Sequence, residues 1–382
     1  MIWVLAVISA AAAAYQAIAL VATVRHFRGD RRKRPRPADM SDGDPSFCPP
    51  VSILKPMHGS EPGLYEALRS HALQDYPDFE IVFGVRTMGD SSIADIERLR
   101  CEFPNLNLRL VHCPGKAPNG KVAVLADLAR MAHHSLLLVN DADITVPAGY
   151  LRHVVAPLAD PSTGIVTCLY RASAGHLPGR WEGLGIVTDF APSTLVAPFV
   201  GISEFGLGST IAFRRADLKA IGGFEAIADY IADDYQLGAR IHRLGRRNVI
   251  SRVVVDTHLH ASSWEEVWQH QLRWARTIRL SRGAYAGLFI TQATFWAVVD
   301  ALFGLWWLEL PLLALRMAMA LTAGWWGMRS RDVLRLWPLI PLRDLWGTCV
   351  WFAGMFGNRV RWRDQVLTLD RRGRIVRTVR TS

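Results

Sequence analysis

Cysteine is scarce in this chain and follows no pattern of metal ligands. The five cysteines among 382 residues include no CxxC pair. The sequence therefore indicates neither a structural zinc site nor a disulfide framework. Cysteines without such a pattern are consistent with a reducing cytosolic location. His258, His260 and Glu265 are scattered and predict no metal site of their own. The Gly-x-x-x-x-Gly-Lys-Ser/Thr loop of P-loop proteins is also absent, because residues 114–121 have a different spacing.

Charged residues are few, at 20% of the chain, whereas 50% of the residues are hydrophobic and 14 are tryptophan. This balance is typical of a membrane protein. The net charge of +10 is compatible with nucleic-acid binding, but Lys and Arg concentrate just beyond apolar segments. Basic residues in that position are attracted to anionic lipid head groups. We therefore expect an anionic phospholipid surface as a partner, and no nucleic acid.

The N-terminal segment predicts a membrane anchor. Residues 2–24 are apolar and uncharged, and seven basic residues follow between Arg25 and Arg36. An apolar run of this length spans a bilayer, and a basic cluster behind it is a cytoplasmic stop signal. The alternative is a cleaved signal peptide, but its basic cluster would precede the apolar run. We expect an uncleaved anchor.

Three further apolar stretches rich in tryptophan are membrane candidates, at residues 285–308, 310–328 and 336–357. Three crossings after a cytosolic domain would place the Arg-rich C-terminal tail outside the cell, against the positive-inside tendency. One stretch is therefore expected not to cross. The last one, which contains Pro338 and Asp344, is predicted to be interfacial or re-entrant.

Between the anchor and these stretches, short apolar runs alternate with helical patterns. Such an order predicts an α/β domain with a mostly parallel, doubly wound sheet, in which ligands collect at the carboxyl ends of the strands. The predicted strands lie at residues 51–54, 80–85, 106–112, 136–139, 165–169, 210–213 and 249–255. The helices predicted between the first four strands are 64–73, 93–103 and 121–131.

The chain is thus predicted to contain six parts. They are an N-terminal transmembrane anchor (1–25), a basic, proline-rich linker (26–48), the α/β domain (49–262), an amphipathic interfacial helix (263–283), C-terminal membrane segments (284–357) and a basic cytosolic tail (358–382). This layout predicts a multi-pass protein of a bacterial-type inner (cytoplasmic) membrane, with the α/β domain in the cytosol.

An Asp-x-Asp pattern follows the strand predicted at 136–139, where Asp141 and Asp143 flank an alanine. Carboxylates at the carboxyl end of a strand offer hard oxygen ligands to Mg²⁺ or Mn²⁺. Either ion can bridge them to a pyrophosphate and take up the charge of a leaving group. The pattern is also common in solvated turns, so it indicates a metal site only together with other features.

A second acidic pair, Asp233 and Asp234, stands at the start of a helix predicted to run to Arg243. Carboxylates in this position cap free N–H groups and complement the helix dipole, which would keep them ionised. The functional alternative is that Asp234 is a general base that accepts a proton from a hydroxyl group.

Residues 263–280 predict an amphipathic helix, with apolar residues and arginines on different sides. It contains His270, Gln271, Arg273 and Trp274. An arginine beside a pyrophosphate donates bidentate hydrogen bonds, and an indole can stack on or wall a bound ligand. The alternative is a helix that only lies on the membrane surface.

In this order, the segments resemble the ceramide glucosyltransferase-like family of inverting enzymes with a GT-A fold, which includes bacterial enzymes that glycosylate hopanoids. The similarity runs from about residue 51 to residue 274. The strand that ends in Lys55 and Pro56 looks like the family's uridine-binding strand, and residues 119–121 resemble its Asn-Pro-Lys motif.

The resemblance implies a role for each matching position. The residues implied for binding the nucleotide-sugar are Lys55, Pro56, Asp90, Asn119, Lys121, Asp141, His270 and Gln271. The implied metal ligands are Asp141 and Asp143, and the implied catalytic residues are Asp234 as the base, Arg273 and Trp274. The family's terminal motif has Gln or Arg three residues before its Arg-Trp pair. His270 occupies that position here and Gln271 follows it, so either one is a candidate for the donor contact.

The resemblance also implies an activity, namely transfer of a hexose from a UDP-sugar to the hydroxyl of a membrane lipid, with inversion. The hexose would be glucose or N-acetylglucosamine, the acceptor ceramide or a hopanoid polyol, and the cofactor Mg²⁺ or Mn²⁺. Two alternatives remain open at this point. One is a processive polysaccharide synthase, and the other is a catalytically silent membrane protein that binds a nucleotide-sugar.

Overall fold

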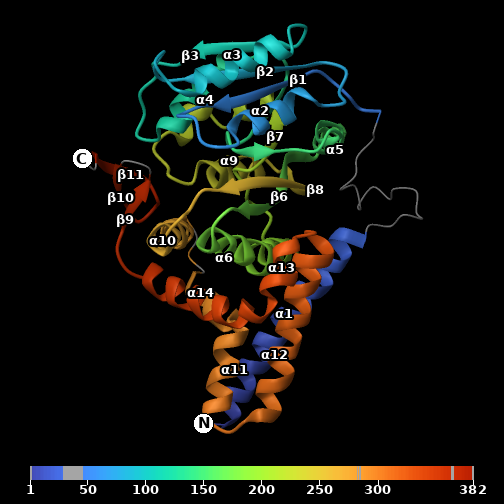
Figure 1. Ribbon diagram of the computed structural model, residues 1–382, viewed down its shortest axis with the longest axis vertical. Helices are drawn as coiled ribbons and strands as arrows, with labels where there is room; N and C mark the ends of the chain where they lie inside the picture. Colours follow the sequence, from blue (N-terminus) through green and yellow to red (C-terminus); the bar gives the residue numbers. More distant parts are fainter. Residues whose placement is uncertain (1, 29–45, 282, 284, 363–364, 381–382) are drawn as a thin grey trace.

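The computed structural model describes residues 2–28, 46–281, 283, 285–362 and 365–380. An α/β domain stands at one end of a bundle of long helices, and the N-terminus lies at the far end of that bundle (Figure 1). Helix α10 (Trp264–Ser281) lies at the level where the domain and the bundle meet. Most of the linker predicted at 26–48 lies outside the described residues.

One eight-stranded sheet forms the centre of the α/β domain, in the order β3-β2-β1-β4-β7-β6-β8-β5. Four parallel strands make up its first half: β3 (Asn107–His112), β2 (Phe79–Val85), β1 (Val51–Pro56) and β4 (Leu136–Val139). The second half contains β7 (Ile211–Arg214), β6 (Thr163–Ala174), β8 (Arg247–Leu259) and β5 (Ile144–Thr145). Strand β7 is antiparallel to β4 and β6, and β5 is antiparallel to β8. The predicted α/β class with a mostly parallel mixed sheet is confirmed.

Strand β1 lies inside the sheet and is covered on both faces. Ile53 packs on the side of helices α2 (Leu64–Ala72) and α3 (Ser92–Glu102), whereas Leu54 packs on the side of α4 (Gly120–Met131). Successive side chains of a strand point to opposite faces, so a strand buried on both sides is mostly apolar. The two buried polar residues of β1 have partners, since Ser52 donates to Glu80 and Lys55 to the Asp141 carbonyl. Burial on both faces explains why the continuous apolar runs of the sequence became these strands.

The α/β domain contains further helices, and some of them contact the membrane bundle. The further helices are α5 (Tyr150–Val155), α6 (Leu177–Gly185), α7 (Ala191–Phe199), α8 (Arg215–Ala220) and α9 (Asp233–His242), with the short turns η1 (Ala156–Ala159), η2 (Ile186–Phe190) and η3 (Phe224–Ile227). Leu184 and Val187 share one apolar cluster with Ala22 and Met328 of the membrane region. The α/β domain and the bundle are therefore packed into one structure.

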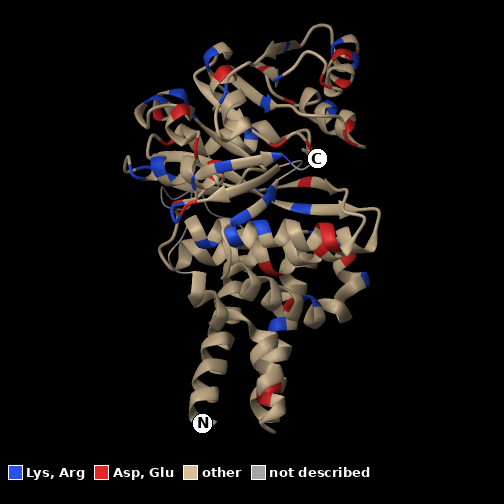
Figure 2. Cartoon of the chain, turned by 90° about the vertical axis from the view of Figure 1, so that its left-hand side faces the viewer, with Lys and Arg blue, Asp and Glu red and all other residues tan. Residues whose placement is uncertain are grey.

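Two described helical segments are long and apolar enough to cross a membrane. They are α1 (Ile2–Arg28), and α12 (Trp306–Leu321) continued by η5 (Thr322–Gly327). A pair bent by 56°, η4 (Tyr285–Thr291) and α11 (Ala293–Leu302), makes a third if its two parts form one span. Figure 2 shows almost no Lys or Arg on the lower parts of the bundle. Both features are those of a membrane protein.

The last apolar stretch has a different shape. It forms α13 (Arg331–Leu336), η6 (Trp337–Leu339) and α14 (Ile340–Gly354), and α14 is not among the helices long and apolar enough to cross. Helix α14 lies across the bundle, below the α/β domain (Figure 1). Buried Arg316 of α12 donates hydrogen bonds to Asp344 of α14 at 2.6 and 2.9 Å, which ties the two helices together. The interfacial location of this stretch stays a prediction.

The C-terminal residues form a small sheet that the sequence reading did not predict. Strands β9 (Arg359–Trp362), β10 (Gln365–Leu369) and β11 (Ile375–Arg380) are antiparallel. Ile375 N–H donates to the Asp229 carbonyl at 2.7 Å, and Ile231 N–H donates to the Gly373 carbonyl at 3.2 Å. The sheet therefore holds the segment that leads directly into α9. Its strands are rich in arginine because only one face is buried.

Candidate active site

Strand β4 ends in a turn that presents the two aspartates of the Asp-x-Asp pattern. The buried amide of Asn140 donates hydrogen bonds to the Tyr150 hydroxyl at 2.8 Å and to the Ser209 carbonyl at 2.9 Å, which hold this turn in place. The Asp141 side chain is 43% exposed and accepts a hydrogen bond from Lys121 Nζ at 2.7 Å. Asp141 is thus a partly solvated carboxylate at the carboxyl end of a buried strand.

Asp143 is held more deeply than Asp141. The Thr257 hydroxyl donates to Asp143 Oδ2 at 2.5 Å. Burial raises the pKa of Asp143, and the charge of Asp141 adds to this effect, whereas Thr257 opposes it. On the inner side, Lys55 Nζ donates to the Asp141 carbonyl at 3.0 Å, and burial lowers the pKa of Lys55 to about 7 against the attraction of the two aspartates. Two neighbouring carboxylates that repel each other, one of them partly desolvated, favour a bound cation.

Asp234 stands in the first turn of α9 and faces the same place. The Gly208 N–H donates to Asp234 Oδ2 at 3.0 Å. A Cβ atom added at Gly208 would lie 3.0 Å from Asp141 Oδ2 and 3.6 Å from Asp234 Oδ2. A side chain at this position would therefore crowd both carboxylates. The structure brings Asp141, Asp143 and Asp234 together at one end of the sheet.

The pKa of Asp234 reflects both its burial and its place at the start of a helix. Burial raises the pKa of Asp234 to about 6, and Asp233 adds to the rise, while Lys121 opposes it. The dipole of α9 favours the ionised form. Burial outweighs it because desolvation disfavours the charged form. A carboxylate with a pKa near 6 is suited to accept and release a proton close to neutral pH.

Lys121 lies among these acids, and Asn119 supports it. Lys121 Nζ lies 2.7 Å from Asp141 Oδ1 and 3.4 Å from Asp233 Oδ2. Burial would lower the pKa of Lys121, but Asp141 and Asp233 outweigh it and raise that pKa. The Asn119 side chain accepts from Lys121 N–H at 3.1 Å, caps α4 and donates to the Tyr230 carbonyl at 2.8 Å. Asn119 therefore positions Lys121 and the segment before α9.

Asp90 lies beside the loop that follows Lys55 and Pro56. Its Oδ1 accepts hydrogen bonds from the Gly59 N–H at 2.9 Å and the Ser92 hydroxyl at 2.6 Å. Burial opposes ionisation, but these hydrogen bonds outweigh it and lower the pKa of Asp90. Asp90 is thus an ionised carboxylate that ties the loop after β1 to the start of α3.

Helix α10 presents its predicted residues in two directions. His270 Nδ1 lies 2.5 Å from Glu182 Oε1 of α6, and the His270 and Trp274 rings lie 4.5 Å apart. Gln271 instead is buried on the other side, where it accepts a hydrogen bond from the Trp346 indole of α14 at 2.8 Å. His270 and Gln271 were the two candidates for contact with the donor. Gln271 faces α14, and His270 faces α6 instead. Arg273 lies half-buried one turn after His270.

Two residues near this helix were missed by the sequence reading. Glu182 is buried, and its Oε2 has no hydrogen-bond partner within the described part of the chain. Tyr170 is half-buried on β6. Its pKa is raised well above the ordinary value by burial first, and then by the charges of Glu182, Asp141 and Asp234. The Tyr170 hydroxyl is therefore within electrostatic range of both Glu182 and the aspartates. No local pattern marks either residue, because their partners are far away in sequence.

The donor atoms at this site fit a hard divalent cation. No group of three His, Cys, Asp or Glu side chains arranged for a metal occurs among the residues that the structure describes. Asp141 and Asp143 offer two carboxylates, which is the usual protein share of a Mg²⁺ or Mn²⁺ site that also binds substrate phosphates and water. Asp141 and Asp143 therefore have the chemistry to hold such a cation.

Comparison with known sequences places these features in a family. The sequence model of glycosyl transferase family 21 matches residues 2–375. Ceramide glucosyltransferase 1 of Caenorhabditis elegans is 26% identical over 212 residues, which cover 54% of this chain and 45% of that protein. A ceramide glucosyltransferase of Komagataella phaffii is 32% identical over 113 residues, or 28% of this chain and 22% of that protein. The matched segments thus span less than half the length of these curated relatives.

Comparison with solved structures confirms the GT-A fold. A mannosyltransferase from Pyrobaculum calidifontis, solved in complex with GDP-Man and Mn²⁺, aligns with a TM-score of 0.52. The alignment covers 91% of this chain and 97% of that protein, at 22% sequence identity. The likeness therefore extends over the bundle as well as the α/β domain.

Proposed function

Because the chain belongs to glycosyl transferase family 21, we propose that it transfers a hexose, glucose or N-acetylglucosamine, from a UDP-sugar to a membrane lipid. The acceptor would be the hydroxyl of ceramide or of a hopanoid polyol. The observation that carries this proposal is the meeting of Asp141 and Asp234 at Gly208, with Asp143 two residues after Asp141, in a domain packed on membrane helices.

Asp234 is the proposed general base. Asp234 is half-buried in the first turn of a helix, and burial raises its pKa to about 6. It is therefore ionised at neutral pH and able to take the proton of an acceptor hydroxyl. A single displacement by that hydroxyl on the anomeric carbon inverts the configuration and needs no nucleophilic residue of the protein. The Gly208 N–H bond to Oδ2 holds the carboxylate in place.

Asp141 and Asp143 are the proposed ligands of Mg²⁺ or Mn²⁺, a cation that supplies charge stabilisation to a departing diphosphate. Lys121 adds a permanent positive charge 2.7 Å from Asp141. In this proposal, Asp90 and the end of β1 at Lys55 and Pro56 lie beside the bound nucleotide. Arg273 is assigned to the leaving UDP, since a guanidinium donates bidentate hydrogen bonds to phosphate.

The acceptor is proposed to enter from the bilayer beneath α10. Trp274 packs against Phe190, with ring centroids 6.2 Å apart, and against His270. This aromatic wall between the aspartates and the membrane helices would exclude water from the reacting hydroxyl, which limits hydrolysis of the donor. Glu182 would orient the His270 ring at this wall. The protein is proposed to be a multi-pass protein of a bacterial-type inner membrane, with the α/β domain in the cytosol.

The activity is tested by mass spectrometry of the lipids that membranes with the overproduced protein make when each UDP-sugar is added. We expect a lipid heavier by one hexose or N-acetylhexosamine with one of the UDP-sugars, and no such product with GDP-mannose. Membranes that carry the Asp234→Asn variant are the negative control and should form little or none of this product. A long polysaccharide product would favour the processive synthase. Donor binding without any UDP release after lipid addition would favour the silent binding protein.

The rate of transfer is expected to fall as the pH decreases through about 6. The reason is that the pKa of Asp234 is raised to about 6, and the protonated carboxyl below that pH no longer accepts the hydroxyl proton. The measurement is kcat at saturating donor between about pH 5 and about pH 8. The residual rate of Asp234→Asn should lack this decline. A wild-type rate that does not fall between about pH 7 and about pH 5.5 would contradict the assignment of Asp234 as the base.

A further inference from the structure

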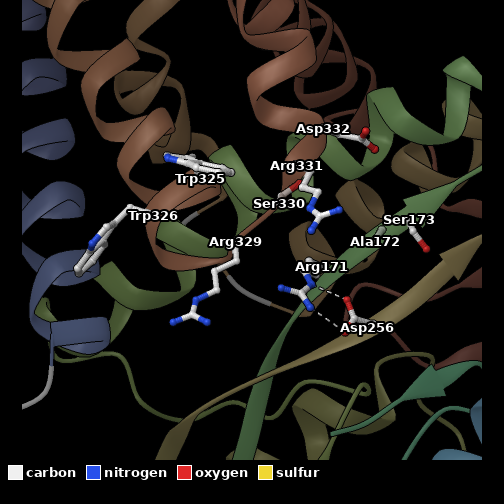
Figure 3. A pocket seen from close by; sticks show the side chains of 10 residues that line it. All are labelled: Arg171, Ala172, Ser173, Asp256, Trp325, Trp326, Arg329, Ser330, Arg331 and Asp332. Carbon is white, nitrogen blue, oxygen red and sulfur yellow. Dashed lines mark hydrogen bonds and ion pairs between the residues drawn. The ribbon is translucent and has the colours of Figure 1, made fainter.

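A cavity of about 820 Å³ opens where the α/β domain meets the membrane helices. Figure 3 shows β6 and β8 on one side of it and the residues after η5 on the other. A second cavity, of about 450 Å³, shares Arg171, Trp326 and Arg329 with the first. Volumes of this size accommodate a small ligand or the head group of a lipid.

This pair of cavities is distinct from the aspartate site because the two lie on opposite faces of β8. The Thr257 hydroxyl points to Asp143, at 2.5 Å. The preceding residue, Asp256, points into the cavity and accepts hydrogen bonds from Arg171 at 2.5 and 3.1 Å. Neighbouring residues of a strand face opposite sides. A ligand in the cavities would therefore not compete with a nucleotide-sugar.

The lining of the two cavities is positively charged. It contains four arginines and two aspartates. Asp256 is already paired with Arg171, and Asp332 lies 3.9 Å from Arg335, which does not line the cavities. Neither Arg329 nor Arg331 has a carboxylate partner within the described residues. The cavities thus offer two guanidinium groups to an anion, and phosphate is the anion that a guanidinium fits best.

The backbone at Arg329 supports a role for its side chain. Arg329 has φ of 54°, and it is the one described residue other than glycine with a positive φ. It follows the end of η5, where glycine is the usual residue because glycine adopts this conformation without strain. The Arg329 guanidinium thus lies at the cavity although its backbone conformation is unfavourable for a residue other than glycine (Figure 3).

The position of the cavities indicates a lipid rather than a soluble anion. Trp325 and Trp326, 46% and 43% exposed, are the last side chains of the span that ends at Gly327. Phe27, at the end of α1, lines the second cavity. Aromatic side chains at the end of a span mark the level of the lipid head groups. The arginines that follow them stand where anionic phospholipids carry their phosphates.

We propose that these two cavities bind the head group of an anionic phospholipid. Its phosphate lies between Arg329 and Arg331, and its glycerol backbone lies against Trp325 and Trp326. The bound lipid fixes the end of η5 against β6, to which Arg171 already connects it by a hydrogen bond to the Met328 carbonyl at 3.0 Å.

The test is the binding of phosphatidylglycerol to the full chain in detergent micelles, followed by native mass spectrometry. The variant is Arg329→Gly combined with Arg331→Gln, in which the glycine relieves the backbone strain, so the folded state should be retained. We expect the apparent affinity for phosphatidylglycerol to fall about tenfold. Binding of phosphatidylcholine, which has no net charge, should be weak in both proteins.

The matched control is Arg335→Gln combined with Arg28→Gln, which also removes two positive charges, from α13 and from the end of α1, outside the lining of the cavities. A loss equal to that of the Arg329 and Arg331 variant would overturn the proposal, because it would show general attraction to the surface. Glycerol 3-phosphate is the soluble arm. If it bound to the wild-type protein as tightly as the lipid, the site would be one for free phosphates and the lipid assignment would be wrong. Unchanged lipid binding in the Arg329 and Arg331 variant would also overturn it.

Discussion

Replacing Asp234 by asparagine is expected to lower kcat by roughly 10²–10⁴-fold while donor binding is retained. Asparagine keeps the size of the side chain and an oxygen that can accept the Gly208 N–H bond seen at 3.0 Å. It removes the only function proposed for the residue, which is to accept the acceptor proton. The measurement is a steady-state assay with the lipid acceptor, together with the Kd of UDP.

The matched variant for this prediction is Asp233→Asn, one residue earlier on the same helix. Asp233 lies 3.4 Å from Lys121 and has no proposed part in proton transfer. The substitution removes the ion pair that helps to position Lys121, so we expect activity to fall by about tenfold or less. Similar losses in both variants would assign the effect to the electrostatics of the helix start. Near-normal turnover of Asp234→Asn would remove Asp234 from the chemistry.

Asp143→Asn is expected to lower kcat by about 10²–10³-fold and to weaken activation by Mn²⁺, because a neutral amide is a much poorer ligand for a hard cation. The asparagine side chain could still accept the hydrogen bond from Thr257, so the turn after β4 should stay in place. Titration of activity with Mn²⁺ after treatment with a chelator measures both effects. An unchanged Mn²⁺ dependence would contradict the assignment of Asp143 as a ligand.

Thr257→Val is the control for the Asp143 variant. It removes the 2.5 Å hydrogen bond to Asp143 and leaves the carboxylate itself in place. A residue that only orients a metal ligand typically changes metal affinity by about 10-fold to 100-fold. We therefore expect a higher Mn²⁺ requirement for Thr257→Val, with kcat recovered at saturating Mn²⁺. Failure to recover would indicate that Thr257 acts on the reaction in another way.

The segment that leads into Asp234 is held by residues from distant parts of the chain. The Asn119 side chain donates a hydrogen bond to the Tyr230 carbonyl. The backbone of the C-terminal sheet forms hydrogen bonds with the backbone of Asp229 and Ile231. On the other side, Arg276 of α10 donates to the carbonyls of Phe356 and Arg359, at 3.0 and 2.6 Å. The Arg-rich C-terminal strands therefore support the proposed base, in addition to any contact that they make with a membrane.

Much of the architecture could be predicted from local patterns. The strand at 136–139 is continuous and apolar and is followed by acids, so both the buried strand and the Asp-x-Asp turn at its end were predictable. The N-terminal anchor was equally clear, since it needs only an apolar run of sufficient length. In both cases, neighbours along the chain supply the whole signal.

Other features depend on contacts between residues that are far apart in sequence. Glu182 meets His270 across 88 positions, Thr257 meets Asp143 across 114, and Arg171 bonds Met328 across 157. The periodicity of the sequence carries no information about such pairs. The pKa of Asp234 belongs to the same class, because burial raises it and burial exists only once the domain is packed. The amino-acid order was thus enough for most strands of the large sheet, the N-terminal apolar helix and the positions of the acids, but not for the C-terminal sheet. Tertiary packing decided which side chains meet and how they are charged, since only folding removes water from around them.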